Sequence, residues 1–321
     1  MYDSLVTCRL FFFTSPSPTV NLLAIVILSR GKCGLSSCTT CYRLAMAIAD
    51  LLVVITDFIL IHINHYYFPA TYLNITPVCS VIYVLSRAAR DCSVWFTVTF
   101  SFDRFIAICG QKLKTKYCTG KTAALVLSTT YILFCVKNIP FYVTFEPQKI
   151  INNVPWFCMI KSSYYTEPAW KGFDWFDAVL TPLLPFVLIL LFNALVVRYI
   201  LVASRVRKGL KDPSKGKNQN DPEMENRRKS MIILFSISGS FILLWLVFVL
   251  FFIYYYIAGT NPNYYSGSVH IFLHVGFMLV GLNCCTNTFI YAVTQSKFRN
   301  QFKSLLKYPV TLLTLLVNKE N

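Results

Sequence analysis

Residues 231–257 read MIILFSISGSFILLWLVFVLFFIYYYI, an apolar run without a single Asp, Glu, Lys or Arg. The hydrocarbon core of a bilayer is about 30 Å thick, and a helix needs about 20 apolar residues to cross it. This run therefore predicts a membrane-spanning helix.

The whole chain shares this apolar character. Of its 321 residues, 55% are hydrophobic and 14% are charged, against about 45–50% and about 25% in soluble domains. The composition excludes disordered, collagen-like and coiled-coil proteins and disfavours a water-soluble enzyme. The net charge of +16 does not indicate nucleic acid as a partner, because the basic residues lie between long apolar runs.

Similar apolar stretches predict seven spans, and hence an all-α bundle of seven transmembrane helices within residues 1–295. The first span is the poorest, because Pro16 and Pro18 interrupt it. An alternative start or a splicing error in the gene sequence near residues 14–18 is one explanation for this interruption. The expected spans cover residues 5–28, 39–63, 78–109, 122–145, 173–202, 231–257 and 268–294.

Lys and Arg predict how these spans are oriented. Twenty basic residues lie in alternate connections and the carboxyl-terminal tail, and four lie in the opposite set of connections and the amino terminus. Because basic connections stay in the cytoplasm, the amino terminus is expected outside and the carboxyl terminus inside. A multi-pass protein of the plasma membrane is the expected localisation.

Residues on the predicted outer side carry signs of that environment. Asn74-Ile75-Thr76 is an acceptor sequence for N-glycosylation. Cys79 and Cys158 face the oxidising side, so we expect them to form a disulfide that ties the longest outer loop to the third span.

Asp103 and Arg104 close the third span. Arg104 follows Cys79 by 25 residues, which is about 37 Å of helix and therefore about one membrane thickness with its interface. An ordinary ion pair at a helix end is one interpretation, since such residues commonly reach the membrane surface. Motifs in the neighbouring spans favour a second interpretation, in which the pair has a functional role.

Six of the seven expected spans each carry a short motif of their own, and these motifs follow one another in a fixed order. Together they resemble the rhodopsin-like (class A) G-protein-coupled receptor family, and most closely an orphan branch, the probable G-protein coupled receptor 139 type. Asn193, eight residues after Pro185, suits that branch. The resemblance also implies a short amphipathic eighth helix over 297–307, followed by the tail to residue 321. The motifs are Asn21–Val26 in the first span, Leu44–Leu51 with Asp50 in the second, Asp103-Arg104-Phe105 in the third, Pro185 in the fifth, Phe241 and Trp245 in the sixth, and Asn287-Thr288-Phe289-Ile290-Tyr291 in the seventh.

The resemblance assigns roles to these residues. Arg104 is expected to pair with Asp103 in the inactive state and to meet the G protein in the active one. Tyr291 is expected to swing inward to support the active state, and Trp245, with Phe241 beside it, to couple the ligand pocket to the core.

A polar group is expected at the middle of the membrane. Asp50, Ser93, Asn283 and Asn287 offer oxygen atoms that suit a small hard cation, and the resemblance implies a sodium ion that favours the inactive state. A hydrated polar network without a fixed ion is the alternative. We expect no other cofactor and no metal site.

The sequence also departs from the family pattern. The sixth span lacks the Pro expected two residues after Trp245, so we expect it to lack the usual kink, and Thr288 replaces the Pro of the seventh. Residues 227–229 are all basic, so no acid is expected there to hold Arg104. High basal activity is one expected consequence.

Charged residues in the outer half of the third span mark a candidate ligand site. Arg87 and Asp91 are one turn apart and are expected to pair, which leaves Arg90 for a ligand carboxylate. The alternative is that Arg90 pairs with Asp174 or Asp177 instead. Further candidates for the pocket are Asp177, Trp245, Tyr254, His274 and Phe277.

These observations predict a receptor that binds an extracellular small molecule or peptide and activates a heterotrimeric G protein. Membrane lipid is a further expected partner, through the basic connection at residues 203–230. A non-signalling or truncated receptor-like protein is the main alternative, and a small transporter is a weaker one because no internal repeat is present. An enzymatic activity is not expected.

Overall fold

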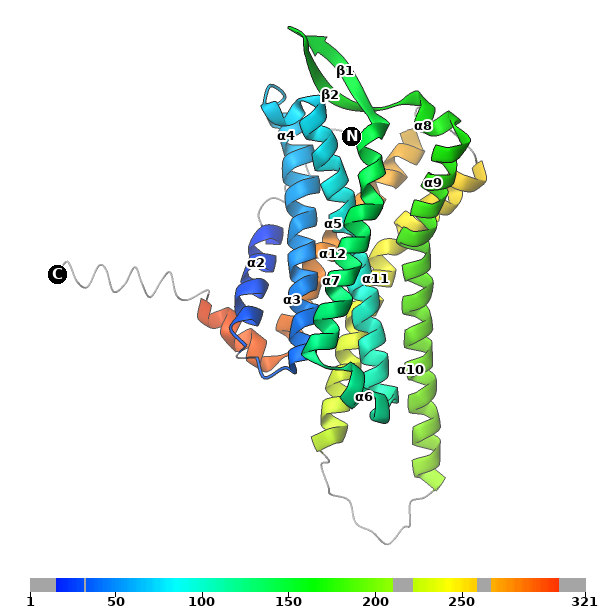
Figure 1. The fold of residues 1–321 in the computed structure, drawn as a ribbon. Coiled ribbons are helices and arrows are strands. Elements are labelled where there is room, and N and C mark those ends of the chain that lie inside the picture. Colours follow the sequence, from blue (N-terminus) through cyan, green and yellow to red (C-terminus); the bar gives the residue numbers. More distant parts are fainter. Residues whose placement is uncertain (1–15, 32, 210–221, 259–266, 306–321) are drawn as a thin grey trace, which may run out of the picture.

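The computed structural model describes residues 16–31, 33–209, 222–258 and 267–305. These residues form a bundle of long, roughly parallel helices, with a two-stranded sheet projecting from one end (Figure 1). The predicted fold class, an all-α helical bundle of the seven-span type, is confirmed. We call the end that carries the sheet the hairpin end, and the end where α5 stops at Cys109 the basic end.

Six of the spans are long and apolar enough to cross a bilayer. The described part of the first span, α2, has 14 residues, and the remainder of the predicted span lies outside the described residues. The elements that build the spans are α2 (Pro16–Ser29), α3 (Ser37–Val53) with the π-helix η1 (Val54–Ile63), α5 (Thr76–Cys109), α7 (Gly120–Asn138) with the 3₁₀-helix η3 (Ile139–Thr144), α9 (Pro168–Ala178) with the π-helix η4 (Val179–Leu183) and α10 (Leu184–Gly209), α11 (Pro222–Ala258) and α12 (Gly267–Thr294).

Shorter elements fill the connections. At the hairpin end these are α4 (Asn64–Tyr67), the 3₁₀-helix η2 (Tyr72–Asn74), β1 (Phe145–Ile151), β2 (Val154–Ile160) and α8 (Ser162–Thr166), and at the basic end α6 (Gln111–Tyr117). Residues 296–305 are helical, close to the expected eighth helix, and Phe302 and Leu305 pack against the core below α2.

Local sequence explains where several helices begin. The hydroxyl of Ser36 accepts a hydrogen bond from the backbone N–H of Thr39 at 3.3 Å, and Thr119 caps α7 in the same way. Both side chains satisfy N–H groups that the first helical turn leaves without partners. Pro77 stands at the start of α5, where its missing N–H carries no cost.

α5 lies at the centre of the bundle and contacts α3, α7, α10 and α11. Its buried face includes Phe96 and Phe100, which belong to a core shared with α2, α3, α7 and α12. Large apolar side chains on the outer faces, such as Leu125 and Leu243, are about 70% exposed. In a bilayer these outward residues meet lipid, so both faces of the helices are accounted for.

The β1–β2 hairpin is the part of the fold that the sequence analysis did not predict. The strands are antiparallel, and Asn152 and Asn153 form the turn with φ angles of 51° and 61°. Asn tolerates this left-handed conformation, which suits a two-residue turn. The predicted disulfide between Cys158 of β2 and Cys79 of α5 is confirmed and anchors the hairpin over the bundle.

The connection between α10 and α11 differs from the expected loop over residues 203–230. α10 continues to Gly209 and α11 begins at Pro222, so both helices extend beyond the predicted spans. α11 runs as one α-helix to Ala258, in keeping with the missing proline after Trp245.

Asn74 does not fit the predicted glycosylation. Its side chain is 6% exposed, and its amide nitrogen donates hydrogen bonds to the carbonyl oxygens of Phe68 and Pro69 at 3.2 and 2.9 Å. Its amide oxygen accepts a hydrogen bond from Asn64 at 2.9 Å. A glycan on this nitrogen would break the contacts that hold the loop, so the structure assigns Asn74 a structural role.

We therefore expect the protein, expressed in animal cells, to show no shift in gel mobility after treatment with an N-glycosidase. A positive control is Val154→Thr, which creates an acceptor sequence at exposed Asn152 on the tip of the hairpin. This variant should shift after treatment if the hairpin end is translocated. A shift of the unmodified chain would contradict the structural role of Asn74.

Candidate functional site

Polar and charged side chains occupy three levels along α5. A charged cluster lies near the hairpin end, a network around Asp50 lies in the middle, and the Asp103–Arg104 pair lies at the basic end. A charged side chain within an apolar bundle is stable only when it is paired or hydrated, so the partners of each level determine what its residues can do.

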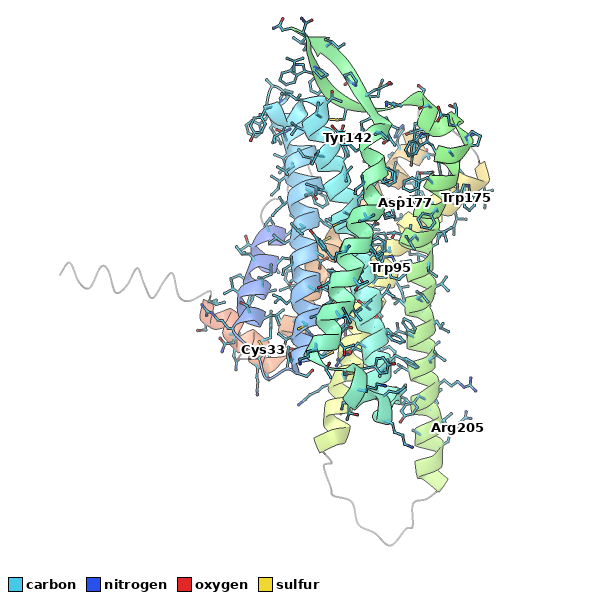
Figure 2. The ribbon with its side chains drawn as sticks, viewed as in Figure 1. Cys33, Trp95, Tyr142, Trp175, Asp177 and Arg205 are labelled. Carbon is cyan, nitrogen blue, oxygen red and sulfur yellow. A yellow bond between two sulfur atoms is a disulfide. The ribbon has the colours of Figure 1, made fainter. Side chains whose placement is uncertain are left out.

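The charged cluster is a chain of alternating signs. Arg87 forms an ion pair with Asp177 of α9 at 3.3 Å, and Lys137 of α7 forms ion pairs with both Asp177 and Asp91. The distance from Lys137 Nζ to Asp91 is 2.7 Å, and Asn138 also donates to Asp91 at 2.7 Å. Asp177 is labelled in Figure 2, close to α7, and it closes the chain between α5, α7 and α9.

Arg90 has a partner of its own in the second span. Its guanidinium lies 3.3 Å from the carboxylate of Asp57 in η1, and Ser86 donates to the same carboxylate at 3.3 Å. The ring of Phe277 lies 5.8 Å from the Arg90 guanidinium, within reach of a cation–π contact. Asp57 belongs to a π-helical segment, a form that often marks functional positions.

Two predicted pairings are therefore wrong. Arg87 pairs with Asp177 and not with Asp91, because α9 and α7 approach α5 on that side. Arg90 pairs with Asp57, and not with Asp174 or Asp177. A ligand that contacts Arg90 has to compete with, or bridge to, the Asp57 carboxylate.

Asp57 and Lys137 were missed by the sequence analysis. Each is a charged residue inside an expected span, and this signal alone would have marked it as costly and therefore in need of a partner. Sequence spacing could not show which helix supplies that partner.

Asp174 joins two further elements at the hairpin end. Tyr164 of α8 and Tyr256 of α11 donate hydrogen bonds to its carboxylate at 2.6 and 2.8 Å. Burial raises the pKa of Tyr164, and the neighbouring Asp174 carboxylate adds to the effect. The tyrosine hydroxyl consequently stays protonated and keeps donating.

The remaining predicted pocket residues fall into two groups. Phe277 packs on Phe248 with ring centroids 5.1 Å apart, and His274 stacks on His270 at 6.4 Å. Tyr254 is 45% exposed on α11 and is the poorest candidate for an enclosed pocket. Trp245 is 2% exposed and lies deep in the bundle.

Trp245 stands at the centre of an aromatic stack on α11. Its ring lies parallel to that of Phe241 at 5.3 Å and edge-on to that of Phe248 at 5.7 Å. These rings belong to a buried cluster that joins α5, α10, α11 and α12. A displacement of Trp245 would be felt by three neighbouring helices, because packed cores transmit strain.

The middle level brings three of its four predicted residues into direct contact. Ser93 donates to one oxygen of Asp50 at 2.5 Å, and Asn287 donates to the other at 2.9 Å. Asn283 is buried one turn before Asn287 on α12. Asn287 thus presents its nitrogen to Asp50, whereas the sequence analysis expected its oxygen to face a cation.

Asn21 of α2 links the first span to this level. Its amide nitrogen donates to the carbonyl oxygen of Cys284 at 2.8 Å, and its amide oxygen accepts from Thr288 at 3.3 Å. Thr288 therefore supplies a hydrogen bond between α12 and α2.

The basic end contains the predicted Asp103–Arg104 pair. Arg104 Nε lies 3.0 Å from the Asp103 carboxylate and its terminal nitrogen also donates to it. The thiol of Cys38 donates to the other oxygen of Asp103 at 3.1 Å, which ties α3 to α5. The Arg104 guanidinium lies 5.6 Å from the ring of Phe100.

Tyr291, at the end of α12, is fully buried beside Arg43 of α3. The Arg43 guanidinium lies 4.7 Å from the centre of the Tyr291 ring, and Phe298 meets this ring edge-on at 5.9 Å. Sequence reasoning missed Arg43, which lies near the end of a span and reads as an interfacial residue. In the structure it is 2% exposed.

Comparison with known proteins gives a family match over most of the chain. The family described as 7 transmembrane receptor (rhodopsin family) matches residues 20–291. This range includes all three polar levels of α5 and the aromatic stack around Trp245.

Individual relatives are distant. A tachykinin-like peptides receptor 86C of Drosophila melanogaster is 24% identical over 86% of this chain and 53% of its own length. An FMRFamide receptor of the same organism is 22% identical over 88% of this chain and 50% of its own. An atypical chemokine receptor 3 of Rattus norvegicus is 24% identical over 87% of this chain and 74% of its own. The chain spans about half the length of the first two relatives.

The charged cluster makes a prediction for Lys137. Replacing it by Met leaves the Asp91 carboxylate buried without a cation and places it near the like charge of Asp177. Breaking a buried ion pair in this way costs about 3–5 kcal/mol. We expect Lys137→Met to lower the thermal midpoint of the purified protein by several degrees, whereas Lys171→Met, at an exposed position of α9, leaves it unchanged.

The double variant Asp91→Asn/Lys137→Met separates charge from packing. Because it removes both members of the pair, it should recover part of the lost stability. An unchanged midpoint for Lys137→Met alone would contradict the assigned pairing.

Proposed function

Because the chain belongs to the rhodopsin family of seven-transmembrane receptors, we propose that it is a receptor that binds an extracellular ligand and activates a heterotrimeric G protein. The observation that carries this proposal is the Asp103–Arg104 pair at the end of α5, beside the buried Tyr291 of α12. Arg104 is held by a neighbour on its own helix, so a change in the surrounding helices can release it toward a partner.

The bundle supports such a release through its connected levels. The Asp50 network joins α3, α5 and α12, and the Trp245 stack joins α11 to α5 and α12. A ligand that favours one arrangement of these helices shifts the whole bundle between two states by its differential affinity. Trp245 and Phe241 are the proposed link from the ligand to Arg104.

The proposed orientation places the hairpin end outside the cell and the basic end in the cytoplasm, at the plasma membrane. Twenty basic residues on one side support it, as does the disulfide at the hairpin end. The G protein then meets the basic end, where the charge of the connections also attracts anionic lipid.

A peptide is the proposed class of ligand. Two relatives are named as receptors for tachykinin-like peptides and for FMRFamide. The charged cluster offers both cations and acids within reach of the hairpin end, which suits the mixed charges of a peptide terminus. Within the family we propose a kinship with the orphan receptor type numbered 139, which Asn193, eight residues after Pro185, supports.

A sodium ion at Asp50 is a further proposal. The carboxylate of Asp50 and the hydroxyl of Ser93 are hard oxygen ligands that fit the ion, and Asn283 lies on the adjoining turn of α12. The amide of Asn287 would have to rotate to present its oxygen. Sodium bound there would join α3 to α5 and favour the state in which Asp103 holds Arg104.

The receptor proposal is tested by G-protein activation in cells that carry the chain at their surface. Peptide FMRFamide and tachykinin-like peptides serve as probes, beside the ligand-independent signal. We expect Arg104→Ala to reduce both signals about tenfold or more, because loss of one charged contact costs at least about 1.4 kcal/mol. Lys121→Ala, at an exposed basic residue of the same end, should leave them unchanged.

Surface staining controls for folding in both variants. Equal signals for Arg104→Ala and the intact chain would refute the role of Arg104. A chain that reaches the surface but gives no signal with any probe or without one would favour the alternative, a receptor-like protein that does not signal.

The sodium proposal predicts an ion-specific effect on stability. Exchanging sodium chloride for N-methylglucamine chloride at equal ionic strength should lower the thermal midpoint of the intact protein, since the ion binds only the folded state. Asp50→Asn should abolish this difference, whereas Ser238→Ala, at another buried hydroxyl, should retain it. A sodium effect of the same size in Asp50→Asn would exclude this site.

A further inference from the structure

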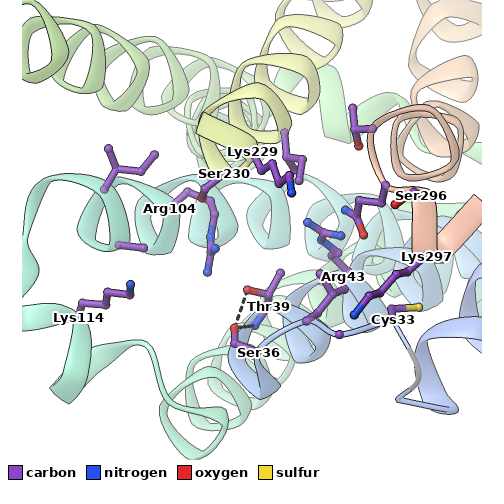
Figure 3. A pocket seen from close by; sticks show the side chains of 17 residues that line it. Cys33, Ser36, Thr39, Arg43, Arg104, Lys114, Lys229, Ser230, Ser296 and Lys297 are labelled. Carbon is purple, nitrogen blue, oxygen red and sulfur yellow. Dashed lines mark hydrogen bonds between the residues drawn. The ribbon is translucent and has the colours of Figure 1, made fainter. Parts of the chain in front are cut away.

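The basic end of the bundle contains a cavity beside Arg104, and most of its lining has no role in the proposed activation mechanism. It has a volume of about 570 Å³, within the range of about 300–1,000 Å³ of small-molecule sites. Figure 3 shows seventeen residues around it, contributed by the turn between α2 and α3, by α3, α5, α6 and α11, and by the end of α12 with the segment after it.

The lining of this cavity is strongly cationic. Five of the seventeen residues are Arg or Lys, and each comes from a different element: Arg43, Arg104, Lys114, Lys229 and Lys297. None of the seventeen, all in the described part of the chain, is Asp or Glu. Asp103 pairs with Arg104 from outside the lining, so the positive charge available to a ligand comes mainly from Arg43, Lys114 and Lys297.

Arg43 is the most constrained of these cations. It is 2% exposed, and its Nε and Nη1 atoms have no hydrogen-bond partner among the described residues. Tyr291 covers one face of the guanidinium at 4.7 Å, which leaves the donor edge for a ligand. A buried donor without an acceptor costs free energy, and a guanidinium fork matches the oxygen atoms of a phosphate group.

Two neutral residues of the lining add further polar groups, of which the Ser230 hydroxyl and the Gln295 amide nitrogen are donors. Within the described part of the chain, the hydroxyl of Ser230 and both polar atoms of the Gln295 side chain are buried without hydrogen-bond partners. Together with Arg43 they represent α3, α11 and the segment after α12. Unsatisfied polar groups on three sides of one cavity indicate an occupant rich in acceptor atoms.

Gly34 makes room for the cation of Lys297. It has a φ angle of +64°, and a Cβ atom at this position would lie 2.6 Å from Lys297 Nζ. Any side chain would therefore displace the ammonium group. Gly34 thus lets the Lys297 side chain lie directly against the backbone at this edge of the cavity.

We propose that this cavity is a binding site for a compact anion that carries several phosphate groups. The Arg43 guanidinium donates hydrogen bonds to one phosphate group, and the lysines at the rim neutralise the charge of the other phosphate groups. A single carboxylate would leave most of the cationic charge unmatched, whereas each phosphate group brings a charge of about −1.5 to −2 and three acceptor oxygens.

The bound anion also affects signalling, and this consequence alone rests on the proposed function. Arg104 lines the same cavity, so an occupying anion screens the residue that the G protein is proposed to meet. It also bridges α3, α11 and the segment after α12, and so opposes their separation. The site would accordingly act as a brake on coupling.

Direct binding tests the site without a G protein. The full chain, purified in detergent, is titrated with inositol 1,4,5-trisphosphate and with inositol hexakisphosphate. We expect saturable, salt-sensitive binding that Arg43→Gln weakens about tenfold or more and Lys297→Gln weakens to a smaller extent. Lys121→Gln, an exposed lysine of the same end that does not line the cavity, should bind as the intact chain does.

Arg43→Lys is a second variant that keeps the charge and removes the fork, and it should give an intermediate affinity. Thermal midpoints report whether each variant is folded. If Arg43→Gln does not fold, Lys114→Gln and Lys297→Gln carry the test, because both lie at the surface of the cavity. An equal loss in Lys121→Gln and the cavity variants would overturn the proposal in favour of diffuse attraction.

The source of the phosphate groups is distinguished in nanodiscs. Discs of phosphatidylcholine are titrated with the soluble inositol phosphates, and parallel discs contain phosphatidylinositol 4,5-bisphosphate. Stabilisation by either, lost in Arg43→Gln or Lys297→Gln, supports the site and identifies a free anion or a lipid headgroup. Absence of binding in both arms, or binding only of a Glu-rich peptide, overturns it. Since no G protein is present, either result is independent of the coupling assay.

Discussion

The need to pair charge inside an apolar bundle determines how this structure is arranged. α5 carries five charged residues between Arg87 and Arg104, in a helix that is surrounded by other helices. Each charge has an oppositely charged partner, and the partners near the hairpin end come from three different elements, η1, α7 and α9. α5 is thereby fixed in rotation as well as position, which packing of interchangeable apolar side chains would not achieve.

The remaining polar contacts attach neighbouring helices to this central helix, α5. Asp50 and Asn287 meet α5 through Ser93, and Cys38 meets it through Asp103. The polar contacts therefore run from the hairpin end to the basic end through one helix. These contacts offer a continuous path for the two-state response that we propose.

The sequence predicted the six long apolar helices, the disulfide and the contacts around Asp50, because composition, spacing and charge bias are properties of single segments. It did not predict the pairing of Arg87 and Arg90, because pairing depends on which faces of different helices meet. The hairpin was missed because its strands fall in a segment that we expected to be a loop. Asn152 and Asn153 are the signal of its turn in the sequence. Asp57 was overlooked within an apolar run that is π-helical in the structure.

The two ends of the bundle solve the same electrostatic problem differently. At the hairpin end three cations pair with three carboxylates of the same chain, so the charges balance there. At the basic end Arg104 pairs with Asp103, but Nε and Nη1 of the buried Arg43 have no acceptor among the described residues, and Lys114 and Lys297 line the same cavity. A fold that pairs its charges so fully at one end has the means to do so at the other. The excess at the basic end is therefore best understood as a surface made for an anion from outside the chain.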